Sequence, residues 1–404
     1  SQAIRAAAAK FISKLLFGQN KNEEENNSSL KCLIEFLQKH FCSNKNKNDD
    51  DNINNEDDLP IVISSLFPNL PCLHDWDEMI DILSIETDND KARILAKILY
   101  YSAEKLNSSN NSNDYDNQIR KLSLSLVKFL PTLIKGYQKD DDIVLSLVDA
   151  AKLINLDVIS ENSYEHYFQK LLAEICNIFL HSSNRVVFTT SISSLYELSA
   201  RNHQLSLIAR HELDRLAVEC GNDCDMQVQL QQTLSSSHPS LKQEIENIVA
   251  DRESIAKFVA AARLVDVSDN GKLRSIVVNR INTLSKAIEQ NHDNLNFDSD
   301  FSNVILEVIS DCIECLQFIF RWDMKHVHNK KISKNDYIPT FKENLDIFYR
   351  FLTTTEINQI TQEDKKEEEK INSEEEDKTI KSEEEEEDNE LKIKSNAADR
   401  VKEN

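Results

Sequence analysis

The fold of this chain is decided by the stretch DDDIVLSLVDAAKLINLD, which covers residues 140–157. Its apolar side chains recur every three or four positions, a spacing that places them on one face of a helix. They are Val144, Leu147, Val148, Ala151 and Ile154. Three aspartates precede them, and acidic side chains favour the N-terminus of a helix, where they cap free N–H groups and complement the helix dipole. The stretch predicts an amphipathic α-helix that begins after Asp140.

The same spacing recurs from one end of the chain to the other, with little of the period-two alternation that is typical of strands. The further apolar stripes fall in residues 4–15, 33–41, 92–100, 122–133, 167–179, 192–196, 205–220, 273–288, 305–322 and 341–352. Pro131 lies inside one of them and predicts a kink. The periodicity predicts an all-α chain.

Glycine and proline are scarce, which supports the same fold class. The 404 residues include four Gly and six Pro, whereas average usage would give roughly fifty of the two together. Sheets need these residues at their turns, and phosphate-binding loops need glycine where the backbone approaches the ligand. Gly18, Gly136 and Gly221 each follow a helical stripe, so we expect them to end helices in the left-handed conformation.

The helices pair into hairpins of about 35–45 residues, a period that belongs to HEAT and armadillo repeats. The pairs fall near 140–181, 184–220, 252–290 and 300–354. A single hairpin of this kind cannot bury its apolar face alone and stacks on its neighbours. We therefore expect residues 1–355 to form one HEAT/armadillo-like α-solenoid.

Polar inserts interrupt the predicted array, and an acidic tail follows it. The inserts are rich in Asn, Asp and Ser and comprise residues 19–29, 43–58 and 107–117. In the tail, predicted over residues 356–404, the stretch 361–404 has 18 acidic and nine basic residues. Segments with so few apolar groups cannot offset their ordering entropy, so we expect disorder. Such a tail either solvates the protein or docks on a partner, and Ser373 and Ser382 precede acidic runs that suit acid-directed kinases.

Charge and hydropathy exclude other classes of protein. The net charge of −23 argues against an extended nucleic-acid footprint, which needs clustered Lys and Arg. The sequence has neither an apolar run as long as a membrane span nor the pattern of a signal peptide. The first residue is Ser1 and the chain opens inside a helical stripe, so we expect a piece of a longer protein.

Candidate metal and catalytic residues are few. The eight cysteines lie mostly inside apolar stripes, which indicates buried free thiols in a reducing compartment. The pairs Cys220/Cys224 and Cys312/Cys315 are therefore expected in the core rather than on zinc, and His326 and His328 close a helix. The motifs GxGxxG, GxxxxGK[ST], GxSxG and HExxH are missing. We expect no enzyme, no metal, no cofactor and no small-molecule substrate.

Short segments in a fixed order carry a family resemblance. They are an alanine-rich helix ending in Leu-Phe (Ile4–Phe17), an Asp-Trp helix start (His74–Met79), a Leu-Pro segment (Phe129–Tyr137), Ser193–Leu198 and a closing Phe320–Trp322. In this order they resemble the cohesin SA/stromal-antigen (STAG) subunit family, over about residues 1–352.

The resemblance implies a structural scaffold in the nucleus, associated with chromatin. Members of this family bind the kleisin and, through it, the SMC ring of cohesin, and support sister-chromatid cohesion and chromosome segregation. Arg120 and Lys121 stand near the family's basic loop, so the resemblance implies a weak DNA contact there. The partner-binding residues stay unknown at this point. An unrelated HEAT-repeat adaptor, such as a transport or phosphatase scaffold, and a helical enzyme remain as alternatives.

Overall fold

A computed structural model describes residues 26–41, 58–108, 115–234, 251–266, 277–280 and 299–329, together with positions 7, 9–12, 14, 249 and 342. The regular elements in these ranges are α-helices and two short 3₁₀ turns, and the ranges contain no strand. The prediction of an all-α chain is therefore confirmed. The acidic tail 356–404, Gly18, insert 43–58 before Asp58 and most of the stripes at 273–288 and 341–352 lie outside the described residues.

The helices begin and end close to where the stripes predict them. In chain order they are α2 (Asn26–Phe41), α3 (Leu59–Leu66), α4 (Trp76–Ile85), α5 (Asn89–Asn107), α6 (Tyr115–Gly136), α7 (Asp141–Ala151), α8 (Leu156–Glu161), α9 (Glu165–His181), α10 (Arg185–Ser199), α11 (Ser206–Leu234), α13 (Arg252–Leu264) and α15 (Ser299–His328). The 3₁₀ turns η4 (Phe67–Asn69) and η5 (Pro71–His74) connect α3 to α4. Two of the predicted inserts overlap helices: α2 begins at Asn26, inside insert 19–29, and α6 begins at Tyr115, inside insert 107–117.

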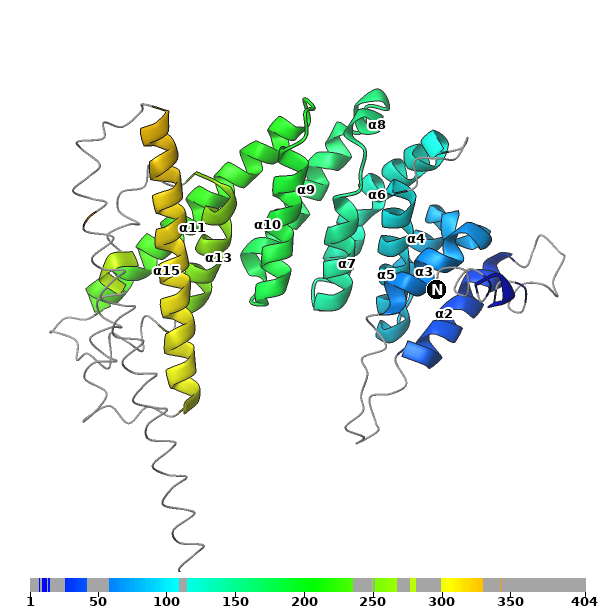
Figure 1. The fold of residues 1–404 in the computed structure, drawn as a ribbon, viewed down its shortest axis with the longest axis horizontal. Coiled ribbons are helices and arrows are strands. Elements are labelled where there is room, and N and C mark those ends of the chain that lie inside the picture. Colours follow the sequence, from blue (N-terminus) through cyan, green and yellow to red (C-terminus); the bar gives the residue numbers. More distant parts are fainter. Residues whose placement is uncertain are drawn as a thin grey trace, which may run out of the picture. The chain divides into compact units, whose positions relative to one another are not determined.

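Two compact units divide the chain, and the helices described below belong to the first unit, residues 1–280 and 298–325, apart from the last turn of α15. The second unit consists of residues 281–297 and 326–404. Within the first unit, consecutive helices pack side by side in chain order (Figure 1). This arrangement matches the hairpins predicted at 140–181 and 184–220.

The packing of these helices forms two layers. Helices α5, α7, α10 and α13 each contact the next one in this series, and we call them layer A. Helices α4, α6, α9 and α11 do the same and form layer B. Two contacts show that α4 and α6 run in the same direction: Asp77 accepts from Ser125, and the Tyr137 hydroxyl donates to the Leu83 carbonyl. In layer A, Arg93 near the start of α5 pairs with Asp140 at the start of α7, so this pair is parallel as well, as in a stacked helical-repeat array.

The core lies between the two layers and is apolar. Its largest fully buried side chains include Trp76, Phe168, Phe179, Phe188 and Phe258. Phe179 of α9 meets Phe188 of α10 edge to face, with ring centroids 6.2 Å apart. Aromatic pairs favour this geometry because the positive ring edge faces the negative ring face. The apolar stripes therefore form the buried interface between one helical hairpin and the next.

Five of the described helices begin at a short polar side chain, as the sequence predicts for the helix after Asp140. Asp140 caps α7 by accepting from the Ile143 N–H, and Asp75 caps α4 by accepting from the Glu78 N–H. Asp88, Asn155 and Asn184 cap α5, α8 and α10 in the same way. Each cap satisfies backbone donors that the first helical turn leaves without a partner.

Helix ends differ from the prediction that glycine would close them. Gly136 is the last residue of α6, Gly221 lies inside α11, and the described glycines have no positive φ. The expectation of left-handed glycine caps at Gly136 and Gly221 is therefore wrong. Several terminal carbonyls are instead satisfied by side chains from helices or loops that come later in the chain.

The same kind of contact, a side-chain donor bound to carbonyls at the end of a helix, recurs along the array. Tyr137 donates its hydroxyl to the carbonyls of Leu83 (2.7 Å) and Glu86 (3.2 Å) at the end of α4. Lys257 of α13 donates to the Leu180 carbonyl of α9 at 2.6 Å. Arg201 donates to the carbonyls of Lys152 and Ile154 just after α7, and Trp322 of α15 to the Ala262 carbonyl of α13. The ends of these helices are thus fixed by tertiary contacts.

Candidate partner-binding surface

The candidate DNA contacts Arg120 and Lys121 lie at the start of α6, but their side chains have different neighbours. Arg120 donates to Glu161 Oε2 at 3.3 Å and to Asn162 Oδ1 at 3.0 Å, both at the end of α8. Lys121 is exposed and lies near Asp75 and Asp77, on the side of α4. The two residues are adjacent in sequence, yet the structure does not join them into one basic patch.

Lysines follow one face of α6 beyond this pair. Lys121, Lys128 and Lys135 are exposed and seven residues apart, which places them in a row with a spacing of about 10.5 Å. The Lys128 ammonium lies 4.7 Å from the centre of the Phe129 ring. Helix α4, which packs beside α6, exposes Asp77 and Asp81. The charge on this part of layer B is therefore mixed, which limits how many phosphates it can neutralise.

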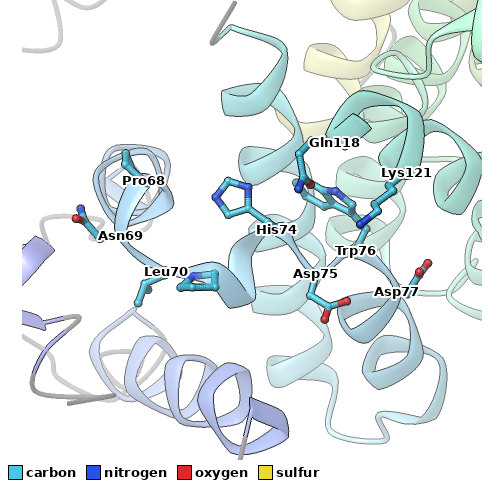
Figure 2. Close-up of a pocket in the computed structure, with 10 residues that line it drawn as sticks. Pro68, Asn69, Leu70, His74, Asp75, Trp76, Asp77, Gln118 and Lys121 are labelled. Atoms are coloured by element: carbon cyan, nitrogen blue, oxygen red, sulfur yellow. The ribbon is translucent and has the colours of Figure 1, made fainter. Parts of the chain in front are cut away.

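A hollow of about 590 Å³ lies where the 3₁₀ turns and the first turns of α4 and α6 come together. We call it the Trp76 hollow (Figure 2). It is lined by Pro68, Asn69, Leu70, Pro71, His74, Asp75, Trp76, Asp77, Gln118 and Lys121. Its volume falls in the range of ligand pockets, about 300–1,000 Å³.

The groups that line this hollow are held in place by the local fold. His74 donates from Nε2 to the Phe67 carbonyl at 3.0 Å, and its ring meets the edge of the Trp76 indole at a centroid distance of 6.5 Å. Asp75 caps α4, and the Asp77 carboxylate accepts from the Ser125 hydroxyl at 2.6 Å. Trp76 itself is almost fully buried, and its Nε1–H finds no hydrogen-bond acceptor among the residues that the structure describes.

A second hollow of about 440 Å³ lies between α9 and α11, and we call it the α9–α11 groove. It is lined by Gln169, Leu172, Ala173, Cys176, Asn177, Leu180, Ile208, Glu212 and Arg215. Arg215 donates to Glu212 at 2.9 Å and to Glu219 at 2.7 Å. Burial and, to a smaller extent, the Glu212 carboxylate raise the pKa of the Cys176 thiol to about 12. Cys176 is therefore a protonated apolar lining residue and not a nucleophile.

The cysteine and histidine pairs occupy structural positions. Cys312 and Cys315 are fully buried in α15, as predicted, and neither forms a disulfide bond. Burial raises the pKa of Cys312 to about 12, which disfavours the thiolate that a metal needs. Cys220 is buried in α11, and His326 and His328 lie at the end of α15. Among the described residues, no three His, Cys, Asp or Glu side chains gather as a metal site would require.

Sequence reasoning missed both hollows. Their lining residues come from segments that are far apart in the sequence, for example Pro68–Pro71 and Gln118–Lys121 in the Trp76 hollow. The one available signal was the Asp75-Trp76 pair, a large indole at the first position of a helix, which the family resemblance had singled out. The 3₁₀ turns beside it have no periodic pattern of apolar residues from which their position could be predicted.

The comparisons with known proteins agree with this architecture. The model of the family described as "Cohesin subunit SCC3/SA, HEAT-repeats domain" matches residues 62–322, well over half of the chain. A search of curated proteins finds no match. None of the described helices is long and apolar enough to cross a membrane. The matched range runs from α3 through α15 and contains both layers. The chain belongs to the HEAT-repeat family of cohesin SCC3/SA subunits.

Proposed function

We propose that this protein is a structural scaffold of cohesin that binds the kleisin subunit and, through it, the SMC ring. The observation that carries the proposal is the family match over residues 62–322, joined to the two-layer array that those residues form. A stacked array presents one continuous surface to an extended partner. The role that follows is support of sister-chromatid cohesion and chromosome segregation on nuclear chromatin, without catalysis. Family membership removes the alternative of an unrelated HEAT-repeat adaptor.

Layer B is the face on which we expect the kleisin to dock. The α9–α11 groove is the docking site that we assign to the kleisin on this layer. The groove has an apolar floor that includes Leu172 and Ile208, and neighbouring Leu207 of α11 is 63% exposed. An amphipathic helix can lay its apolar face in such a groove. Affinity is then spread over several weak contacts along the layer.

Titration calorimetry of the full chain against overlapping kleisin peptides tests this proposal. We expect at least one helical kleisin segment to bind, and Ala173→Glu in the groove to weaken that segment about tenfold or more, because it places a charge against an apolar partner face. Ala200→Glu is the matched control, since Ala200 is exposed just after α10 and outside the groove. If no kleisin segment binds a folded chain, kleisin binding by this array is refuted.

For DNA, we propose a weak, strongly salt-dependent contact that includes Arg120 and Lys121. The acidic balance of the chain and the pairing of Arg120 with Glu161 support a small number of phosphate contacts. Reversing both charges, Arg120→Glu with Lys121→Glu, should lower the slope of log K against log salt by no more than about 2. The control reverses two exposed lysines of α2, Lys31 and Lys39. Submicromolar affinity for duplex DNA at physiological salt would contradict the proposal.

A further inference from the structure

We propose that the Trp76 hollow binds an extended peptide segment of a partner protein. A backbone carbonyl of that segment accepts a hydrogen bond from Trp76 Nε1–H, and an arginine or lysine side chain lies against Asp75 and Asp77. This site is separate from the α9–α11 groove, and it does not depend on kleisin being the partner.

The first argument is the indole of Trp76. Its Nε1–H is buried without an acceptor, whereas the indole of Trp322 donates to the Ala262 carbonyl at 2.8 Å. A buried donor without a partner destabilises the folded chain, so a ligand that supplies the acceptor recovers part of that free energy. The half-buried side chain of Gln118 lines the same wall of the hollow, as Figure 2 shows. Because Trp76 Nε1 is itself buried, the proposal requires the Gln118 side chain to rotate when the ligand binds.

The second argument is charge. Asp75 and Asp77 each use Oδ1 to accept a hydrogen bond from the protein, and their Oδ2 atoms accept none from the described residues. Lys121 is the one cation that lines the hollow, and it makes no ion pair with a described residue. Two carboxylates against one ammonium group leave a net negative site, which favours a cationic ligand and disfavours an anion.

The third argument is the opposite wall. Pro68, Leu70 and Pro71 form it, with the Pro68 and Pro71 rings at the start of the two 3₁₀ turns. Proline has a fixed φ and no N–H, so this wall is rigid and carries few donors that would compete for a ligand carbonyl. A segment of three or four extended residues, about 10–13 Å long, fits a hollow of this kind. The polar groups on the helical side then select its register.

Tryptophan-labelled NMR of the full chain tests the site directly, since the chain has two tryptophans. The probe is the capped peptide Ala-Pro-Ala-Arg-Ala-Pro-Ala, and the control peptide has Glu in place of the central Arg. We expect the indole N–H signal of Trp76 to move downfield with the Arg peptide while the Trp322 signal stays in place. The Arg peptide should bind at least about threefold more tightly than the Glu peptide.

Two variants separate recognition from folding. Asp77→Asn keeps an acceptor for Ser125 and removes the charge, so it should bring the two peptides within about twofold of each other. Trp76→Phe should weaken the Arg peptide about fivefold, because it removes the N–H and keeps the ring; the unchanged Trp322 signal reports an intact fold. An unmoved Trp76 signal at millimolar Arg peptide overturns the proposal, as does equal affinity for the two peptides. Neither outcome bears on kleisin binding.

Discussion

The contacts that join neighbouring helices within layer A differ in kind from those within layer B. In layer A, Arg93 of α5 pairs with Asp140 (3.0 Å) and Asp142 (3.3 Å) at the start of α7. Farther along, Asn184 donates to Asp141 at 2.7 Å, and Lys152 pairs with Glu197 of α10 at 3.5 Å. In layer B, neighbouring described helices are joined by hydrogen bonds such as Ser125 to Asp77 and Tyr137 to the Leu83 carbonyl, and both hollows lie there.

This difference indicates that layer A mainly stabilises the array, whereas layer B offers the surface for binding. Charged links across layer A fix the spacing of consecutive hairpins, with helix caps such as Asp140 serving two purposes at once. Layer B leaves space between helices, and space is what a partner segment needs. The predictions below test whether the two layers respond differently to the same kind of change.

The largest effect should come from removing a buried leucine in each layer. Leu147 of α7 and Leu172 of α9 are both fully buried, but Leu172 lines the α9–α11 groove. We expect Leu147→Ala to lower the free energy of unfolding by about 3–4 kcal/mol and Leu172→Ala by about 2 kcal/mol, because water can enter the space beside the groove and shrink the cavity cost. Urea denaturation measures both; equal losses would remove the distinction between the layers.

The next effect concerns the link from α10 to α15. Arg185 donates to Asp311 through both terminal nitrogens, and the Asp311 side chain is 5% exposed whereas that of Arg185 is 45% exposed. Arg185→Met should destabilise the protein by about 2 kcal/mol at pH 7, because it strands a buried carboxylate. Asp311→Asn in the same chain should restore most of that loss.

This link also predicts a pH dependence. Burial raises the pKa of Asp311 even with Arg185 beside it, and loss of Arg185 raises that pKa further. A raised folded-state pKa means that the penalty is absent below the unfolded pKa and grows as pH rises through the folded one. The deficit of Arg185→Met should therefore shrink between pH 7 and pH 5, as followed by thermal unfolding. A deficit that grows on acidification would refute the assignment.

A smaller effect is expected at the end of α4. Tyr137→Phe removes the hydroxyl that donates to the Leu83 and Glu86 carbonyls and keeps the ring. We expect a loss of about 1 kcal/mol, the usual contribution of such a hydrogen bond. Hydrogen exchange should show faster exchange at the last turn of α4 and little change in α7. Tyr196→Phe is the control, because Tyr196 is 41% exposed on layer A.

The smallest effect should follow deletion of residues 362–404. This stretch is rich in Glu and Lys and poor in apolar residues, so it has little to bury against either layer. We expect the melting temperature to change by less than about 1 °C. A drop of several degrees would mean that the tail docks on the array and stabilises it.

Much of this fold follows from periodicity, because a stripe at three- or four-residue spacing has few other stable solutions. Within the stretch 140–157, α7 begins after its cap at Asp140 as predicted, but it ends at Ala151, and α8 begins at Leu156. The ion pair of Asp140 with Arg93 was not predictable, since 47 residues separate the two and each reads as a surface charge. Gly136 ends α6 without a positive φ, so the left-handed cap predicted from its place after an apolar stripe is wrong.

The candidate site was less accessible to prediction than the fold. Arg120 and Lys121 were predicted as one pair from their adjacency, but successive helical residues point about 100° apart. Arg120 therefore reaches α8 while Lys121 lines the Trp76 hollow. Three chain segments form the hollow. The pattern of apolar residues within one segment does not predict that the three lie together.

The donors at the helix ends have a consequence for how the chain is made. The ends of α4, α7, α9 and α13 are completed by Tyr137, Arg201, Lys257 and Trp322, and each donor lies later in the chain than the helix it serves. During translation a helix leaves the ribosome with its last carbonyls open, and they are satisfied only when the donor behind it has emerged. We therefore expect the last turn of each of these helices to stay frayed in a nascent chain until its donor has been synthesised.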